Sequence, residues 1–148
     1  VSSGTVEKAA VTTAVVAGTV GIFVGCSYTD PSTNQLTFNQ QFPASTAASD
    51  IMAYVVDDPK LVFKMQGDEA IAQTGLGNNV SAVNTAGSTT IGRSRNALDG
   101  GSIATTNTLP LRILEFVDGP DSTVGDAFTD CLVTYLPLSH AYETKLGV

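Results

Sequence analysis

Residues 18–67 read GTVGIFVGCSYTDPSTNQLTFNQQFPASTAASDIMAYVVDDPKLVFKMQG, and this stretch decides the fold. Its side chains alternate with the two-residue period of a β-strand in four runs, at residues 22–28, 36–42, 51–56 and 61–65. The connections carry turn residues such as Asp30-Pro31 and Asp57-Asp58-Pro59-Lys60. The stretch therefore predicts a β scaffold, and nothing in it supplies a catalytic nucleophile, a base or a metal cage.

The rest of the chain continues this pattern. Residues 109–117 and 127–136 alternate as two further long strands, and Pro137 is expected to end the second. Two short strands are predicted near Val80–Val83 and Ser88–Arg93, and Asp68 predicts a short helical turn through Ala72 that stops at Gly75. We therefore expect an all-β fold, a single-domain β-barrel or β-sandwich with long loops, one short helix and an N-terminal arm.

Length and composition favour one domain that packs against other proteins. The chain has 148 residues, which we divide into an N-terminal arm or edge strand over residues 1–20 and a single β domain over residues 21–148. Charged residues make up only 14%, where about 25% is typical. Because Lys and Glu are depleted at the cores of protein interfaces, this neutral polar surface is typical of an assembly component.

The net charge is −7, from 14 acidic and seven basic residues, which disfavours direct binding to a phosphate backbone. Ala9–Gly25 is an apolar segment of 17 residues, whereas a membrane helix needs about 20. A secretory signal is a second interpretation of this segment, since FVGC loosely resembles a lipoprotein cleavage box. We favour an arm that enters a strand, with no membrane contact.

The two cysteines, Cys26 and Cys131, each lie inside an apolar alternating run. This position predicts buried small hydrophobic side chains. Whether the two thiols are paired stays open, because a disulfide requires the two strands to be neighbours with suitable geometry.

Two motifs could bind ligands, and both are better explained as turns. Gly87–Ser94 matches the phosphate-binding loop except that Arg93 replaces Lys, and its flanks predict neither a buried strand before it nor a helix after it. Asp57-Asp58, and Asp118 with Asp121, offer oxygens for calcium or magnesium but stand beside prolines in turns, where Asp caps backbone N–H groups.

The remaining catalytic candidates are single residues. His140 is the only histidine, so a multi-histidine metal site is excluded, and we expect it at the surface or at an interface. Glu115 lies within an apolar strand and should need a cationic partner, for which Lys64 or Arg95 is our prediction. With no Trp for a sugar-binding groove and no nucleophile elbow, we expect a non-enzymatic protein with no catalytic, cofactor-binding or metal site.

Several segments carry a family resemblance: GIFVGCSYTDPSTNQLTFNQQFPASTAASDIMAYVVDDPKLVFKMQ, STTIGRS, LRILEFVD, GDAFTDCLVTY and SHAYETKLGV. Together they resemble the decoration, or cement, proteins of tailed double-stranded DNA phage heads. The resemblance covers Gly21 to Val148. It implies a virion protein on the capsid exterior that binds the major capsid protein, stabilises the capsid and self-associates, often as a homotrimer.

Two other functions remain open from the sequence. One is a carbohydrate- or receptor-binding β module on a virion or cell surface, which would need an exposed aromatic platform. The other is a nucleotide-binding enzyme that uses Gly87–Ser94, which would need a strand, a loop and a helix around that motif.

Overall fold

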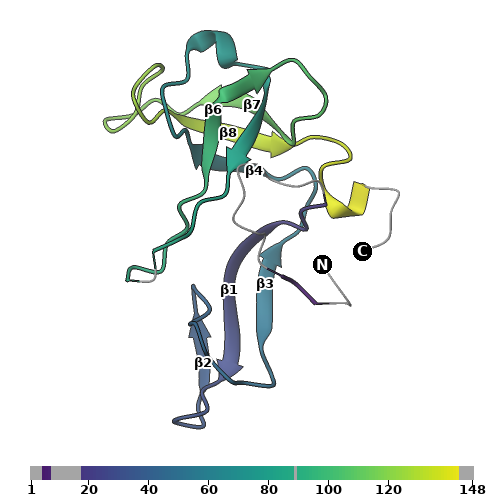
Figure 1. Ribbon diagram of the computed structural model, residues 1–148, viewed down its shortest axis with the longest axis vertical. Coiled ribbons are helices and arrows are strands. Elements are labelled where there is room, and N and C mark those ends of the chain that lie inside the picture. The colour runs from purple at the N-terminus through teal and green to yellow at the C-terminus, as the bar shows by residue number, and fades with distance from the viewer. Residues whose placement is uncertain (1–4, 8–17, 89, 144–148) are drawn as a thin grey trace.

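The computed structural model describes residues 5–7, 18–88 and 90–143, and these residues form two antiparallel β-sheets (Figure 1). The predicted all-β fold is confirmed. Neither sheet closes into a barrel within these ranges. Of the arm predicted over residues 1–20, the structure describes only residues 5–7 and 18–20.

The first sheet has three strands in the order β2-β1-β3. They are β1 (Ile22–Thr29), β2 (Leu36–Asn39) and β3 (Met52–Val56). The β1–β2 turn forms because the Asp30 carboxylate accepts the N–H of Ser32 at 2.7 Å and Asn34 adopts φ 55°. A register shift between Phe23 and Gly25 in β1 inserts one residue opposite β3.

The second sheet has five strands in the order β4-β8-β7-β5-β6. They are β4 (Val62–Gln66), β5 (Asn79–Val83), β6 (Ala97–Ala104), β7 (Leu111–Phe116) and β8 (Asp130–Tyr135). The sheet curls until the residue after β4, Gly67, bridges Leu98 of β6. Two short 3₁₀ turns complete the described elements, η1 (Gln73–Gly75) and η2 (Ala141–Glu143).

The hydrophobic core lies inside the curl of the five-stranded sheet. Alternate residues of β7 and β8 point inward and supply much of this interior. Its buried members are Ile71, Val80, Ala82, Leu98, Leu111, Ile113, Cys131, Val133 and Tyr135. The buried β1 residues Cys26 and Tyr28 are not part of this cluster.

The chain just before β1 is joined to the chain just after β8. Thr19 pairs with His140 as a parallel bridge. The N–H of Gly18 donates to the Ser139 carbonyl at 3.0 Å, and the N–H of Ala141 donates to the Thr19 carbonyl at 2.9 Å. These bonds hold the three-stranded sheet below the five-stranded body in the view of Figure 1.

Two local predictions are wrong, and one strand was missed. The helical turn expected from Asp68 is absent at that position, because the Asp68 carboxylate instead accepts the N–H of Gly100 at 3.0 Å; the nearest turn is η1. The strand predicted at Ser88–Arg93 is a single bridge that closes a loop. The strand β6 was not predicted.

Candidate functional site

One face of the three-stranded sheet gathers large apolar side chains. Residues that pair across antiparallel strands share a face, and Ser27 in the middle strand pairs with Phe38 on one side and Met52 on the other. The same register places Leu36 opposite Thr29 and Tyr54 opposite Gly25. We call this surface the apolar sheet face, and its large members are Leu36, Phe38, Met52, Tyr54 and Val56.

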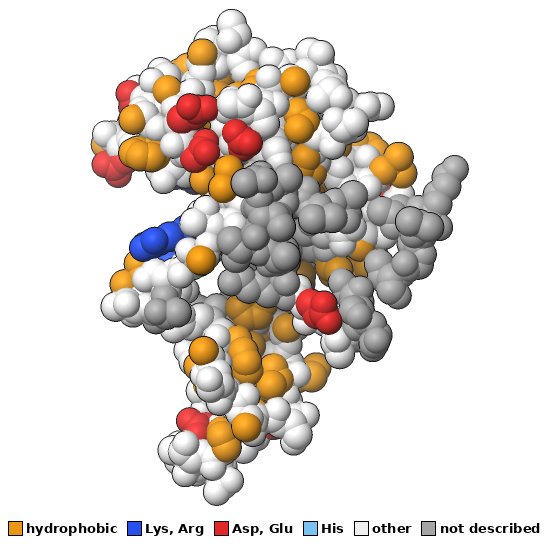
Figure 2. Space-filling view, in the orientation of Figure 1, with side chains coloured by type: hydrophobic (Ala, Val, Ile, Leu, Met, Phe, Trp, Pro, Cys, Tyr) orange, Lys and Arg blue, Asp and Glu red, His pale blue; other side chains and the backbone are white. Residues whose placement is uncertain are grey.

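The apolar sheet face is open to solvent. Its five large side chains are between 37% and 66% exposed. Figure 2 shows hydrophobic side chains at the surface over the region of the three-stranded sheet. Single exposed apolar residues are normal on a protein surface, but a contiguous apolar patch of several hundred Å² marks an interaction site.

The opposite face of the same sheet is covered by the chain after β2. Cys26 and Tyr28 are buried there, and the Tyr28 ring meets Phe42 edge-on with ring centres 5.8 Å apart. The Cys26 thiol donates to the carbonyl of Gln41 at 3.6 Å. The cover on this side is partial, because Phe23 and Ala53 share this face with Cys26 and are exposed. The large side chains of the apolar sheet face have no comparable cover.

Hydrogen bonds fix the shape of this face. The hydroxyls of Ser27 and Tyr54 lie 2.8 Å apart, which ties β1 to β3. Asp50 accepts the Thr29 hydroxyl at 2.6 Å and the Thr29 N–H at 3.1 Å, and these bonds lower the pKa of Asp50. A surface whose shape is already fixed loses less conformational entropy on binding.

Both cysteines are buried and unpaired, Cys26 in the three-stranded sheet and Cys131 in the five-stranded sheet. Their predicted burial is confirmed. Burial, and after it the charge of Asp130, raises the pKa of the Cys131 thiol to about 11. A thiol with this pKa stays neutral near pH 7 and is a poor nucleophile.

The prediction of His140 at the surface is wrong. Its side chain is fully buried and lies between the rings of Tyr135 and Tyr142, at ring-centre distances of 5.5 and 5.1 Å. Its Nδ1 accepts the N–H of Tyr142 at 3.3 Å, and its Nε2 has no hydrogen-bond partner among the described residues. The backbone of His140 pairs with that of Thr19, so this residue lies where the chain before β1 meets the chain after β8.

The prediction that Glu115 needs a cationic partner is also wrong. Glu115 is exposed, because a register shift between Ile113 and Glu115 breaks the alternation of β7. Lys64 instead pairs with Asp130, a buried residue at the start of β8.

The two ligand-binding motifs are turns, as expected. In the described part of Gly87–Ser94, the N–H of Ser88 donates to the Arg93 carbonyl at 3.0 Å, and the next element is the strand β6 rather than a helix. The Asp58 carboxylate accepts the N–H of Lys60 at 2.8 Å. Gly119 and Ser122 close a tight turn that contains Asp121, and Asp118 directly precedes it.

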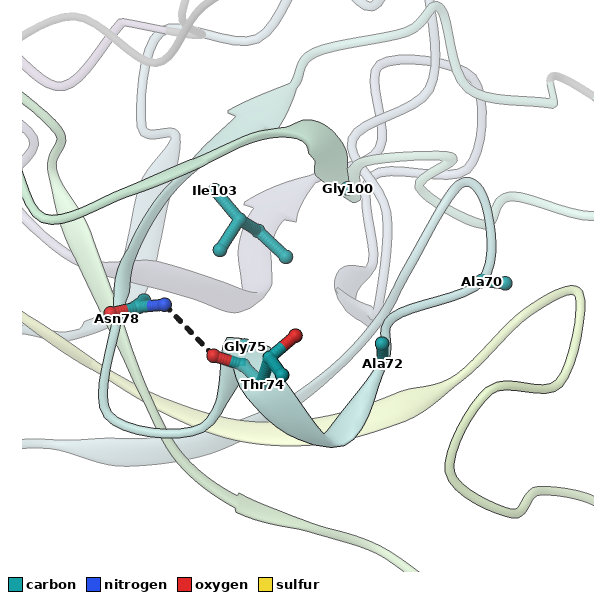
Figure 3. A pocket seen from close by; sticks show the side chains of 7 residues that line it. All are labelled: Ala70, Ala72, Thr74, Gly75, Asn78, Gly100 and Ile103. Carbon is teal, nitrogen blue, oxygen red and sulfur yellow. Dashed lines mark hydrogen bonds between the residues drawn. The ribbon is translucent and has the colours of Figure 1, made fainter.

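Two shallow hollows of the described surface differ in the side chains that line them. One of about 370 Å³ lies beside η1, where the Asn78 amide donates to the Thr74 carbonyl at 2.9 Å (Figure 3). Its lining has no titratable side chain: Ala70, Ala72, Thr74, Gly75, Asn78, Gly100 and Ile103. A second hollow of about 430 Å³ includes Asp68, Arg95, Asn96 and the exposed ring of Phe128.

The structure also gathers three acids that sequence reasoning missed. Oxygens of Asp68, Glu69 and Asp99 lie within 4.8 Å of one another on the surface. The sequence carries only a weak signal for this cluster, because β6 was not predicted. Asp99 lies near the other two acids because Leu98 of β6 bridges Gly67, the residue before Asp68.

Comparisons with known proteins give no relative. No family model, curated protein or solved structure matches the chain. No helix among the described residues is both long and apolar enough to span a bilayer.

Proposed function

We propose that this protein is a non-enzymatic structural virion protein that decorates and stabilises the outside of a phage capsid by binding the major capsid protein. The observation that carries the proposal is the apolar sheet face, which offers large side chains to a partner. The family resemblance of Gly21 to Val148 and the low content of charged residues support it. Self-association, as a trimer, and a sandwich-like arrangement of the two sheets belong to the same proposal.

The energetics of such a role are those of many weak, repeated contacts. Covering about 400 Å² of apolar surface contributes about 10 kcal/mol per copy at ~25 cal/mol per Å². Association costs about 4–15 kcal/mol, so each copy binds only moderately. Because the protein occupies sites that only an assembled capsid offers, many copies together stabilise that assembly by mass action.

Comparison of phage particles with and without this protein tests the proposal. We expect electron microscopy to show extra density on the shell only when the protein is present. We also expect particles that lack the protein to release their DNA at a lower temperature. Identical density and identical heat resistance in the two preparations would refute the proposed role.

One observation favours a second function, a carbohydrate-binding β module. The exposed ring of Phe128 borders a hollow together with Asp68, Arg95 and Asn96. Aromatic rings can stack on the apolar face of a sugar, and these polar groups can bond to its hydroxyls. Binding on a glycan array that Phe128→Ala abolishes would favour this function, and the absence of any glycan signal would exclude it.

A further inference from the structure

The apolar sheet face lies between two acidic ends. Asp30 follows the last residue of β1, and Asp50 is bonded to Thr29 at the same end. Asp57 and Asp58 follow the last residue of β3. Because Val56 pairs with Ile22 at the start of β1, these two acids lie at the other end of the sheet.

The segment that forms this sheet has no positively charged side chain before Lys60. Residues 18–59 contain these four acids and no Lys or Arg, and the next residue is Lys60. Among residues 18–60, the end with Asp30 and Asp50 carries a charge of −2, and the end with Asp57, Asp58 and Lys60 carries a net charge of −1. The eight residues of β1 separate the two ends by about 26 Å at ~3.3 Å per residue.

We infer that the apolar sheet face fits a partner protein surface that is apolar at its centre and flanked on two sides by Lys or Arg groups about 25 Å apart. This inference rests on the proposed function and describes the patch of the capsid shell that the face would occupy. The apolar centre supplies affinity, and the charged ends set the orientation and the rate of encounter.

The same charges argue against a second copy as the occupant. A two-fold pairing of this face would bring acidic ends of both copies toward one another, with no Lys or Arg among residues 18–59 to offset them. This repulsion opposes pairing of the apolar sheet face with itself, most strongly at low salt. It concerns this face alone, so the proposed self-association would use other surfaces of the protein.

The test measures binding to capsid shells assembled without this protein. In one variant Phe38→Ser is combined with Met52→Ser, which makes the centre of the face polar. Its control is Leu114→Ser, since Leu114 is also a large exposed apolar side chain but lies on β7. We expect the double variant to lose affinity by about 10-fold or more and the control to bind as the wild-type protein does.

A second variant removes charge and keeps the turns. Asp30→Asn with Asp58→Asn retains an amide oxygen that can accept the N–H groups of Ser32 and Lys60. Asp126→Asn is its control, because Asp126 caps the N–H of Thr123 in the same way on the five-stranded body. We expect the first variant to bind about 3-fold to 10-fold more weakly at low salt and to lose most of the salt dependence of binding.

Each outcome separates the inference from the proposed function. Wild-type binding that the Phe38/Met52 variant does not change overturns the docking face and leaves the capsid role standing. Binding that changes neither with salt nor in the Asp30/Asp58 variant refutes the inference that Lys or Arg groups flank the partner's apolar patch. No binding of the wild-type protein to shells overturns the proposed function itself. A dimer in sedimentation that the Phe38/Met52 variant abolishes would identify a second copy as the occupant and refute the inference.

Discussion

The ammonium group of Lys64 lies 2.6 Å from a carboxylate oxygen of Asp130. The two residues belong to β4 and β8, which pair directly, so the ion pair ties an outer strand to its neighbour. The Asp130 side chain is 12% exposed and that of Lys64 is 56% exposed. The N–H of Asp130 also donates to the Ser122 hydroxyl at 2.9 Å, which holds the acid in place.

This ion pair should be measurable by a double-mutant cycle with Lys64→Met and Asp130→Asn. Because Lys64 is largely solvated, we expect a coupling free energy of only about 0.5–1 kcal/mol in denaturant unfolding. High salt should reduce the coupling, since it screens the solvated partner. A coupling of zero at low salt would show that the pair adds nothing to stability.

Adjacent residues of β7 should respond very differently to truncation. Ile113 is 0% exposed in the core, whereas its neighbour Leu114 is 43% exposed. Ile113→Ala removes buried methyl groups and leaves a cavity, so we expect it to lower the free energy of unfolding by about 3 kcal/mol. Leu114→Ala is the matched control and should cost less than about 1 kcal/mol. Equal costs would mean that this core is not assembled as described.

Gly21 should be intolerant of any side chain. A Cβ atom at this position would overlap the carbonyl oxygen of Val56, which is backbone of the paired strand and cannot move aside easily. We therefore expect Gly21→Ala to destabilise the protein by about 2 kcal/mol or more. Gly119→Ala is the control, because nothing lies within 4 Å of its Cβ position. Thermal melts that do not distinguish the two variants would contradict this geometry.

The contact between Tyr142 and Asp57 predicts a pH dependence at the alkaline end. The Tyr142 hydroxyl donates to the Asp57 carboxylate at 2.8 Å, and this bond, followed by the negative charge, raises the pKa of Tyr142. The contribution of the bond to stability is present below the unfolded-state pKa of about 10 and is lost as the pH rises through the folded-state pKa.

An ultraviolet titration checks this prediction, with Tyr142→Phe used to isolate the signal of this residue. Asp57→Asn removes the charge, so the pKa of Tyr142 should fall toward its ordinary value of about 10. If the difference titration is the same with and without the Asp57 carboxylate, the hydrogen bond does not persist in solution.

The long strands could be predicted because their patterns are local. Alternation located β1, β3, β4, β7 and β8, and the turn residues Asp30 and Asp58 act as expected. The strand β6 has two glycines and an aspartate in its middle, so its own sequence is a poor strand former. It becomes a strand because β5 supplies its hydrogen-bond partners, and that pairing is non-local.

The errors at individual side chains have the same origin. The predicted burial of Glu115 assumed a regular strand, and one register shift reversed the side on which it lies. His140 lies in a junction formed with the backbone of Thr19, more than a hundred residues earlier in the chain, and local sequence cannot show such a contact. Periodicity could predict which side chains share the apolar sheet face. It could not predict that this face is exposed, because periodicity does not show whether another element covers a face.

One edge strand of the three-stranded sheet, β2, has only four residues, and prolines stand close to both of its ends, at Pro31 and Pro43. Short strands and nearby prolines are devices by which natural sheets resist edge-to-edge aggregation. Their presence beside an exposed apolar surface indicates that the newly made protein must stay soluble for some time before it binds a partner. Aggregation should therefore be strongest when the protein is produced in excess of the partner that covers this surface.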